Sequence, residues 1–539
     1  MNKLIKFTRQ YATRFGLVLL TFLLISCSAS QQSSYVTLLH TNDHHGHFWQ
    51  NKHGEYGLAA QKTLVDNIRD EVSKQGGETF LLSGGDINTG TPESDLLNAK
   101  PDFIGMNLVG YDAMAVGNHE FDHPIELLKQ QEQWANFPFL SANIYDKTTQ
   151  QRLFTPYVIL KKGRVKIAFI GVTTPDTPKL GSKKILQNVS FTDPITEVKT
   201  LSAQIRKDKI ADMVVVLSHL GYYEDGKSGT SAYGDVELAR ALNPGDIDGI
   251  ISAHSHSTLC MAAQNTIDLE YKVGEDCRPD YQNGVWIMQA GEWGKFVGRA
   301  NFQIDNNKIK LLSYQMLPVN LKYTVKDADG SKKYVYYTKE IKADPNVVEK
   351  LLPYQQQGEG KLGVVIGTTK HLLQGERSVV RHQQTNLGKL IILAQMWKTD
   401  ADFGLISSGS IRAPIEQGDI TYRDVLTVQP FGNSVGFAQM TGEELIPYLT
   451  TIANMTPGAG AYPQFANITF DLIDGKLKNI KISGNPIQLT KTYRFSLPSY
   501  NASGGDGYPN IMDRFMNTGA IDADILKSYI EEHTPINLN

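Results

Sequence analysis

The sequence predicts an α/β protein built from two folded units, of which the second is smaller and of the α+β type. One observation is the length of 539 residues, which exceeds what a single hydrophobic core normally organises. Another is the alternation of short apolar runs with helical patterns from about residue 35 to residue 311, which is typical of α/β sheets. The third is a connector near residue 344, after which strands and helices begin anew.

The composition is that of a folded soluble protein, with 41% apolar and 20% charged residues. The formal net charge of −3 provides no basic field that would favour a nucleic-acid polymer, so we expect no such partner. We expect a monomer.

The N-terminus has the pattern of an export signal. Basic residues precede Phe15–Ile25, an apolar run too short to span a bilayer. The run ends in L-I-S-C, which resembles a bacterial lipobox and predicts that Cys27 carries lipid once residues 1–26 are removed. Residues 27–34 would then be a polar tether, and Ser28 favours the outer membrane of the cell envelope. The alternative is an ordinary signal peptide followed by an unrelated cysteine.

The other two cysteines, Cys260 and Cys277, can pair if Cys27 carries lipid. A disulfide closing a loop of this size is worth about 3 kcal/mol in an oxidising compartment. No C-x-x-C spacing is present, so we do not expect a zinc site built on cysteines.

Seven apolar runs of the first unit are predicted to be strands, with helices such as Leu58–Gln75 and Ile125–Trp134 between them. The predicted strands are Val36–His40, Phe80–Ser83, Ala113–Val116, Val165–Val172, Met213–Ser218, Gly249–Ala253 and Val285–Gln289.

Five of these strands are followed by polar residues at their carboxyl ends, the edge at which ligands bind in open α/β sheets. A single histidine after a strand is usually structural, but five such endings indicate one site. The residues are Asp43 and His45, Asp86, Asn118 and His119, His219, and His254 and His256.

Carboxylate, imidazole and amide ligands favour Zn, Mn, Co, Fe or Mg over copper. A shared carboxylate can hold two cations roughly 3.5–4 Å apart, and such a pair orients a phosphate and produces hydroxide near neutral pH. No G-x-S-x-G motif is present, so we expect no protein nucleophile.

Residues 344–361 are predicted to be a helical linker and hinge between a first domain, residues 35–343, and a second domain, residues 362–539. Asp344 can cap a helix that has Pro345 at its first position. Pro353 is expected to kink or break this helix, and Gly358 and Gly360 to end it. Strands are expected near Val364–Ile366, Phe403–Ser407 and Phe495–Leu497.

The order D-x-H, G-D, G-N-H-E, a lone histidine and H-x-H resembles the calcineurin-like metallophosphoesterases. The longer stretches T-N-D-H-H-G-H, S-G-G-D-I-N-T-G, G-N-H-E-F-D, Q-P-F-G-N and G-G-D-G-Y are similar to the 5′-nucleotidase family, over about Tyr35 to Ile530. The resemblance implies an α/β/β/α sandwich for the first domain.

The resemblance also implies a ligand set for two divalent ions of Zn, Mn, Co or Mg. One ion would be held by Asp43, His45, Asp86 and His256, and the other by Asp86, Asn118, His219 and His254, with Asp86 bridging. A close relative has glutamine at the position of His256, so this residue is expected to influence metal preference. His44 and His47 fall outside the D-x-H-G pattern and are expected to be supporting or surface residues.

His119 and Asp122 are implied to be a catalytic dyad, in which His119 donates to the phosphate or leaving group and Asp122 holds its tautomer. An alternative role for Asp122 is to cap the helix that follows it.

In the second domain the resemblance implies a nucleotide site. Phe431 and Tyr500 would stack on the base, Asn433 would contact its edge, and Asp506 would bind the ribose hydroxyls; Arg377, Arg381 and Arg412 would bind phosphate. Taken alone, each arginine is more often a solvated or structural residue, and each of the two aromatic residues is more often part of the core. Tyr500 replaces a phenylalanine of a close relative, and S-S-G-S-I-R replaces a glycine-richer loop around Arg412.

The expected function is a lipid-anchored 5′-nucleotidase that uses a two-metal hydroxide to remove phosphate from extracellular AMP, ADP and ATP for salvage, with nucleotide sugars as further substrates. The alternatives are a 2′,3′-cyclic phosphodiesterase with 3′-nucleotidase activity and a nucleotide-binding surface lipoprotein without turnover. A cleft between the domains, with a hinge motion at the linker, is also expected.

Overall fold

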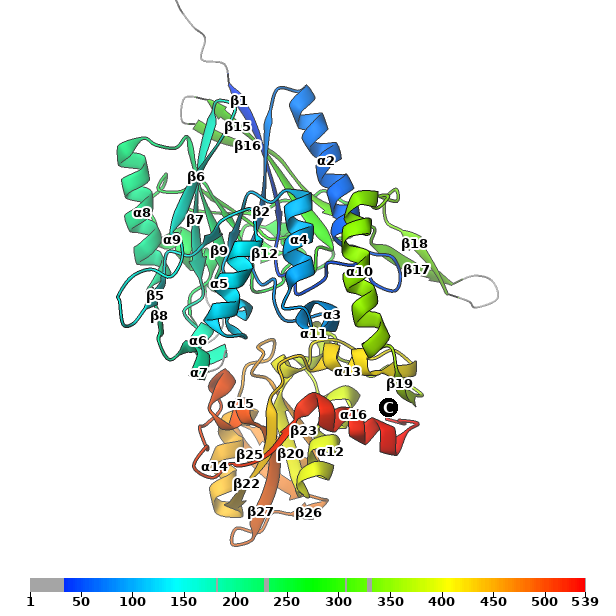
Figure 1. Ribbon diagram of the computed structural model, residues 1–539. Coiled ribbons are helices and arrows are strands. Elements are labelled where there is room, and N and C mark those ends of the chain that lie inside the picture. Colours follow the sequence, from blue (N-terminus) through cyan, green and yellow to red (C-terminus); the bar gives the residue numbers. More distant parts are fainter. Residues whose placement is uncertain (1–32, 181–182, 227–231, 306–307, 327–331, 539) are drawn as a thin grey trace, which may run out of the picture.

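The computed structural model describes residues 33–180, 183–226, 232–305, 308–326 and 332–538 (Figure 1). Cys27, the predicted signal peptide and most of the predicted tether lie outside these residues. Within the described part of the chain, no helix is both long enough and apolar enough to cross a membrane.

The first unit contains two six-stranded sheets that pack face to face. The first sheet has the order β16 (Lys308–Pro318), β15 (Phe296–Asp305), β1 (Ser34–Thr41), β2 (Glu78–Ser83), β3 (Ala113–Ala115) and β4 (Phe139–Leu140). The second has the order β13 (Asp280–Gln282), β14 (Val285–Met288), β10 (Gly249–Ile251), β9 (Met213–His219), β7 (Val165–Thr173) and β6 (Tyr157–Lys162). The seven predicted strands are confirmed, with ends that differ by one or two residues.

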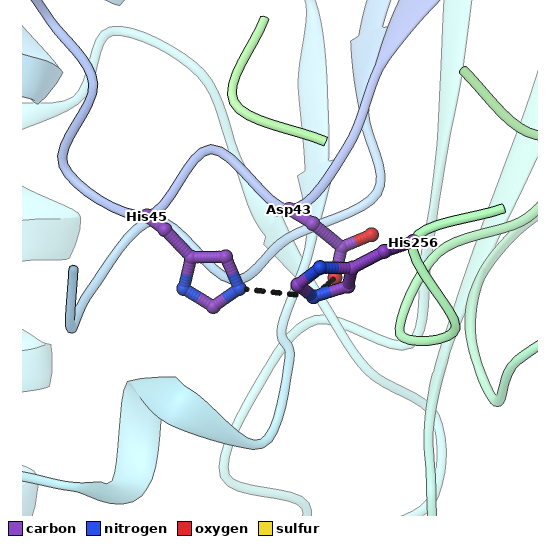
Figure 2. A group of neighbouring side chains, drawn as sticks. All are labelled: Asp43, His45 and His256. Atoms are coloured by element: carbon purple, nitrogen blue, oxygen red, sulfur yellow. Dashed lines mark hydrogen bonds and ion pairs between the residues drawn. The ribbon is translucent and has the colours of Figure 1, made fainter. Parts of the chain in front are cut away.

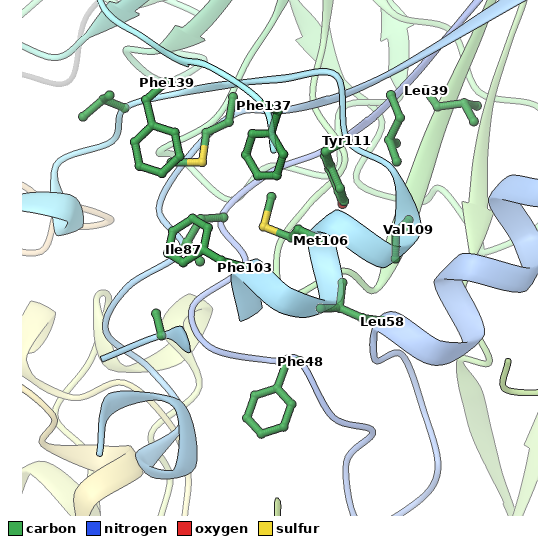
Figure 3. Close-up of a cluster of buried hydrophobic side chains, with 14 of the residues drawn as sticks. Leu39, Phe48, Leu58, Ile87, Phe103, Met106, Val109, Tyr111, Phe137 and Phe139 are labelled. Atoms are coloured by element: carbon green, nitrogen blue, oxygen red, sulfur yellow. The ribbon is translucent and has the colours of Figure 1, made fainter. Parts of the chain in front are cut away.

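Buried side chains of both sheets form one core between them, in which Phe80 of β2 and Phe169 of β7 lie 5.8 Å apart. The outer face of the first sheet is covered by α2 (Leu58–Lys74), α4 (Lys100–Val109) and α5 (Ile125–Trp134), through the cluster in Figure 3. The outer face of the second is covered by α8 (Pro194–Asp208) and α9 (Asp235–Ala241). The four layers confirm the predicted sandwich.

Strands β1 to β4 run parallel to one another, as do β7, β9, β10 and β14. Their carboxyl ends therefore lie along one edge of each sheet. Because these strands are buried on both faces, they are continuous apolar runs in the sequence.

Cys260 and Cys277 are joined by a disulfide in the segment between β10 and β14. The shorter elements of the first unit are α3 (Pro92–Asp95), α6 (Thr177–Leu180), α7 (Lys183–Leu186), and the pairs β5 (Ile144–Asp146) with β8 (Val189–Phe191), β11 (Met261–Ala263) with β12 (Thr266–Ile267), and β17 (Lys322–Lys326) with β18 (Lys332–Tyr336).

The long helix α10 (Pro345–Leu362) leads from the first unit to the second. The carboxylate of Asp344 accepts from the backbone N–H of Val347, which confirms the predicted cap. The predicted break at Pro353 and the predicted end at Gly358 and Gly360 are wrong, because the helix continues to Leu362. Packing against α2, α3 and α4, in which Leu351 is fully buried, holds the helix together despite the missing N–H.

The second unit has a five-stranded sheet in the order β23 (Pro463–Ala466), β20 (Phe403–Ser407), β27 (Thr492–Pro498), β22 (Ser434–Thr441) and β28 (Met516–Ile521). Helices α12 (Asn386–Thr399) and α16 (Asp522–His533) cover one face, and α14 (Gly442–Ala453) covers the other. Its remaining elements are α11 (Arg377–Val380), α13 (Tyr422–Val428), α15 (Ser499–Ala502), the pair β19 (Val365–Thr369) and β21 (Gly418–Thr421), and the hairpins of β24 (Ile468–Ile473), β25 (Lys476–Ile482) and β26 (Asn485–Pro486).

The two units also touch through side chains that lie outside α10. Nε of Arg423, on α13, lies 2.8 Å from a carboxylate oxygen of Glu93, on α3. The limits of the two domains stay predictions.

Candidate metal centre

The polar strand ends meet at one wall of a cleft between the two units, with a volume of about 970 Å³. Three strands of the first sheet and two of the second supply them, so the site lies where the parallel edges of both sheets converge. Three overlapping groups have ligand atoms within 4.8 Å of one another: Asp43, His45 and His256; His45, Asp86 and His119; and Asp86, His219 and His254.

The first group brings two imidazoles together (Figure 2). Nε2 of His256 lies 3.2 Å from Nε2 of His45 and 3.4 Å from a carboxylate oxygen of Asp43. Nδ1 of His45 contacts the carbonyl of Thr89 at 2.7 Å, so Nδ1 carries the proton and Nε2 is an acceptor. Nδ1 of His256 likewise contacts a carboxylate oxygen of Glu292. Two acceptor nitrogens that face each other repel unless a cation lies between them, so this donor set fits a metal ion.

The group of Asp86, His219 and His254 is arranged in the same way around His219. Its Nδ1 donates to the carbonyl of Gly84 at 2.8 Å, while Nε2 lies 3.0 Å from Asp86 and 3.2 Å from the amide oxygen of Asn118. The same oxygen of Asp86 is 3.9 Å from Nε2 of His45. Asp86 thus lies between the two groups, which is the position that a bridging carboxylate needs.

The backbone of this site is strained. Five non-glycine residues have φ between 49° and 73°, in the left-handed region: Asp43, His45, Asp86, His254 and His256. Such conformations cost on the order of 1–3 kcal/mol each and persist where the surroundings enforce them. Gly117 permits the close approach, because a Cβ there would lie 2.1 Å from a carboxylate oxygen of Asp86.

Burial sets the protonation of the site. It raises the pKa of Asp43 to about 7. It also lowers the pKa values of His45, His254 and His256 well below their usual range, so these imidazoles are neutral, which is the form that binds a metal. Burial also raises the pKa of Asp86, but the neighbouring His219 and His119 outweigh this and hold that pKa well below its usual range.

His119 and Asp122 form a close pair, with Nδ1 of the histidine 2.5 Å from a carboxylate oxygen. The hydroxyl of Thr89 donates to the same oxygen at 2.6 Å. Burial lowers the pKa of His119, but Asp122 and Asp86 outweigh this and raise it overall. The alternative role of Asp122 is wrong, because α5 begins after Pro124 and no side chain caps it.

The opposite wall of the cleft belongs to the second unit. All seven residues predicted to bind nucleotide line it: Arg377, Arg381, Arg412, Phe431, Asn433, Tyr500 and Asp506. The guanidinium of Arg412 lies 5.6 Å from the ring centre of Phe431, and the hydroxyl of Tyr500 donates to Asp506 at 3.2 Å. Burial and the neighbouring guanidiniums lower the pKa of Arg381, which indicates a concentrated positive charge suited to an anion.

Asn433 is hydrogen-bonded to Asp522 through both its side chain and its backbone. Its side-chain N–H donates to the carboxylate of Asp522 at 3.3 Å, and its backbone carbonyl accepts from the backbone N–H of Asp522 at 2.9 Å. The side-chain oxygen of Asn433, Oδ1, takes part in neither of these two bonds and can accept from another partner.

His44 and His47 are not among the candidate metal ligands and make other contacts beside the site. Nε2 of His44 contacts Asp102 at 3.0 Å. His47 is partly buried and stacks on Trp293 with ring centres 4.5 Å apart.

Several residues at the site were not predicted. Glu292 contacts His256, Asn42 donates to Asp43 at 2.7 Å, and Tyr223 lines the cleft near Arg377 and Arg381. Only Asn42 could have been suspected, because it lies within T-N-D-H-H-G-H.

Comparisons with known proteins agree with this arrangement. Residues 36–258 match the calcineurin-like phosphoesterase family, and residues 365–513 match the 5′-nucleotidase C-terminal domain. Protein UshA of Yersinia enterocolitica is 54% identical over 93% of this chain and 92% of its own length. A 5′-nucleotidase of Vibrio vulnificus is 50% identical over 95% of this chain and 93% of its own. The crystal structure of a 5′-nucleotidase precursor from Thermus thermophilus superposes with a TM-score of 0.74 at 29% identity, covering 92% of this chain and 96% of that one.

Proposed function

The chain belongs to the 5′-nucleotidase family, and we propose that it hydrolyses the 5′-phosphate of AMP, ADP and ATP at a pair of metal ions. The observation that supports this most strongly is the cleft itself. One wall carries three overlapping groups of candidate metal-ligand atoms, and the other carries three guanidiniums and two aromatic rings.

Two divalent ions, held by Asp43, His45, Asp86 and His256 and by Asp86, Asn118, His219 and His254, would neutralise phosphate charge and activate water. Zn, Mn, Co and Mg all suit this donor set. His119 lies beside this wall with Nδ1 held by Asp122, so its Nε2 is the group available to the phosphate or the leaving oxygen. Its raised pKa favours the protonated form that can donate.

The second unit would orient the nucleotide. Arg377, Arg381 and Arg412 present bidentate donors to phosphate oxygens, and the rings of Phe431 and Tyr500 present faces on which a base can stack. Asp506, held by Tyr500, is an acceptor for ribose hydroxyls, and the free oxygen of Asn433 is an acceptor for the base edge. Nucleotide sugars carry the same base, ribose and phosphate, so we propose them as further substrates.

A substrate panel tests this function. Phosphate release from 5′-AMP, 3′-AMP, 2′,3′-cyclic AMP, ATP and a UDP-sugar should be measured with Mn, Co, Zn and Mg in turn. The expected result is strong preference for 5′-AMP over 3′-AMP. A strong 3′ preference would favour the cyclic phosphodiesterase, and nucleotide binding without phosphate release under any metal would favour a binding protein.

We also propose that Cys27 carries lipid and anchors the enzyme in the cell envelope, on the outer membrane. The L-I-S-C sequence supports this. Cys27→Ser should release the protein from washed membranes into the soluble fraction, and unchanged membrane retention would count against the anchor.

A further inference from the structure

The turn of residues 292–295, with the sequence E-W-G-K, contacts two of the predicted ligands of the first group at once. The N–H of Trp293 donates to the carbonyl of Asp43 at 2.8 Å, and Glu292 contacts His256. Trp293 and Gly294 have φ of 61° and 68°, and the N–H of Lys295 donates back to the carbonyl of Glu292 at 3.0 Å. Two consecutive left-handed residues make this a sharp and specific turn.

The carboxylate of Glu292 is held on both sides. One oxygen contacts Nδ1 of His256, and the other accepts from Nζ of Lys295 at 2.8 Å. Lys295 also lies 4.0 Å from the ring centre of Trp293, which is stacked on His47. Only a fifth of the Glu292 side chain is exposed. The carboxylate therefore has little freedom to leave His256.

This support differs from that of His45 and His219. Nδ1 of His45 and Nδ1 of His219 donate to backbone carbonyls, whereas Nδ1 of His256 donates to a carboxylate. A carboxylate partner fixes the imidazole tautomer, as a carbonyl does, but it also makes the opposite nitrogen a stronger electron donor. Nε2 of His256, which faces His45 and Asp43, receives this effect.

We propose that Glu292 is a positioning residue for the metal site of Asp43, His45 and His256, where it orients His256 and strengthens the binding of that ion alone. The inference rests on the metal centre of the proposed function. Loss of a partner of this kind typically lowers metal affinity 10–100-fold. The site around His219 does not contact the 292–295 turn through any interaction described above, so its affinity should not change.

Cobalt binding to metal-free protein tests this, by calorimetry and by the visible absorption of the bound ion, without any substrate. Wild type should bind two ions. Glu292→Gln should weaken one of them 10–100-fold and leave the other unchanged. Glu71→Gln is the matched control, because Glu71 pairs with Arg299 on the surface of the same unit. It should bind both ions as wild type does.

A double-mutant cycle separates orientation of His256 from general loosening of the site. In a His256→Gln background, the further change Glu292→Gln should alter cobalt affinity by less than about threefold, because there is no imidazole left to orient. A loss of the same size in both backgrounds, or two unchanged sites in the single variant, would overturn the inference.

Glu292→Asp keeps the charge but withdraws it by one methylene. This second variant tests the same role if Glu292→Gln does not fold. It should weaken the same ion, and unchanged affinity would again overturn the inference. If wild type binds no metal at all, both the proposed function and the role of Glu292 fail. If wild type binds two ions and the Glu292 variants bind them equally well, only the role of Glu292 fails.

Discussion

The imidazole of His119, on the first unit, stacks on the ring of Phe431, on the second, with ring centres 5.7 Å apart and planes 16° from parallel. The proposed catalytic dyad and the proposed base-binding wall are therefore in direct contact in this conformation. A substrate that reaches both must lie across the boundary between the two units.

Removing either aromatic ring should weaken nucleotide binding. Tyr500→Ala and Phe431→Ala should each raise KM for AMP about 5–150-fold, because a stacked base is worth about 1–3 kcal/mol. Tyr500→Phe is the matched control: it keeps the ring and removes the hydroxyl that donates to Asp506, so its KM should rise less than that of Tyr500→Ala. Steady-state kinetics would contradict the stacking role if Tyr500→Ala and Tyr500→Phe had the same KM.

Asp86→Asn should lower kcat for AMP by several orders of magnitude with the fold intact. The side chain lies between both groups of ligand atoms, and an amide cannot supply the same negative charge to two ions. Asp400→Asn, an exposed residue of the second unit with φ of 51°, should behave as wild type, because asparagine accepts this conformation. Circular dichroism checks the fold, and near-normal turnover of Asp86→Asn would rule out the bridging role.

Asp522 should make stability depend on pH. Burial raises its pKa to about 7 from 3.8, so between these values the folded protein holds a proton that the unfolded chain releases. The contribution of Asp522 to the unfolding free energy therefore decreases as pH rises from about 4 to about 7 and is constant above that. Asp522→Asn lacks this effect, so its stability relative to wild type should increase across the same window.

Urea unfolding of chelator-treated wild type and Asp522→Asn at pH 4.5 and at pH 7.5 would measure this difference. Equal relative stability at the two pH values would show that the carboxyl of Asp522 titrates normally in the folded protein.

The pair of Glu93 and Arg423 should favour the conformation in which the two units face each other. Glu93 is buried, so Arg423→Met leaves a carboxylate without its charged partner in that conformation. We expect a larger radius of gyration in solution scattering and a higher KM for AMP, with a smaller effect on kcat. Lys527→Met, which breaks an exposed pair within α16, is the control and should change neither quantity. Identical scattering of Arg423→Met and wild type would show that this pair does not hold the units together.

The wall of candidate metal ligands was predictable from the sequence because of how its strands are buried. Strands covered on both faces are largely apolar, so the polar residues that cluster at their ends, such as Asp43 and His219, stand out in the sequence. Parallel pairing then brings these ends to one edge. That two facing sheets share the site did not follow from the strand pattern and came only from the family resemblance.

Other parts could not be predicted, because their partners are remote in the sequence. Glu292 is 36 residues from His256, Asp102 is 58 residues from His44, and Asn42 is 249 residues from Gly291, whose carbonyl accepts its N–H. No local pattern marks such contacts. The predicted break at Pro353 was wrong for a related reason, since local propensity favoured a break and tertiary packing of α10 prevented it.

The central claim is that two metal ions in this cleft carry out 5′-phosphate hydrolysis. It is tested most directly by adding Mn²⁺ stepwise to chelator-treated protein while phosphate release from 5′-AMP is measured. We predict no turnover without metal and full activity at two ions per chain, with Asp86→Asn inactive throughout. Full activity at one ion per chain, or turnover by the metal-free protein, would contradict the account.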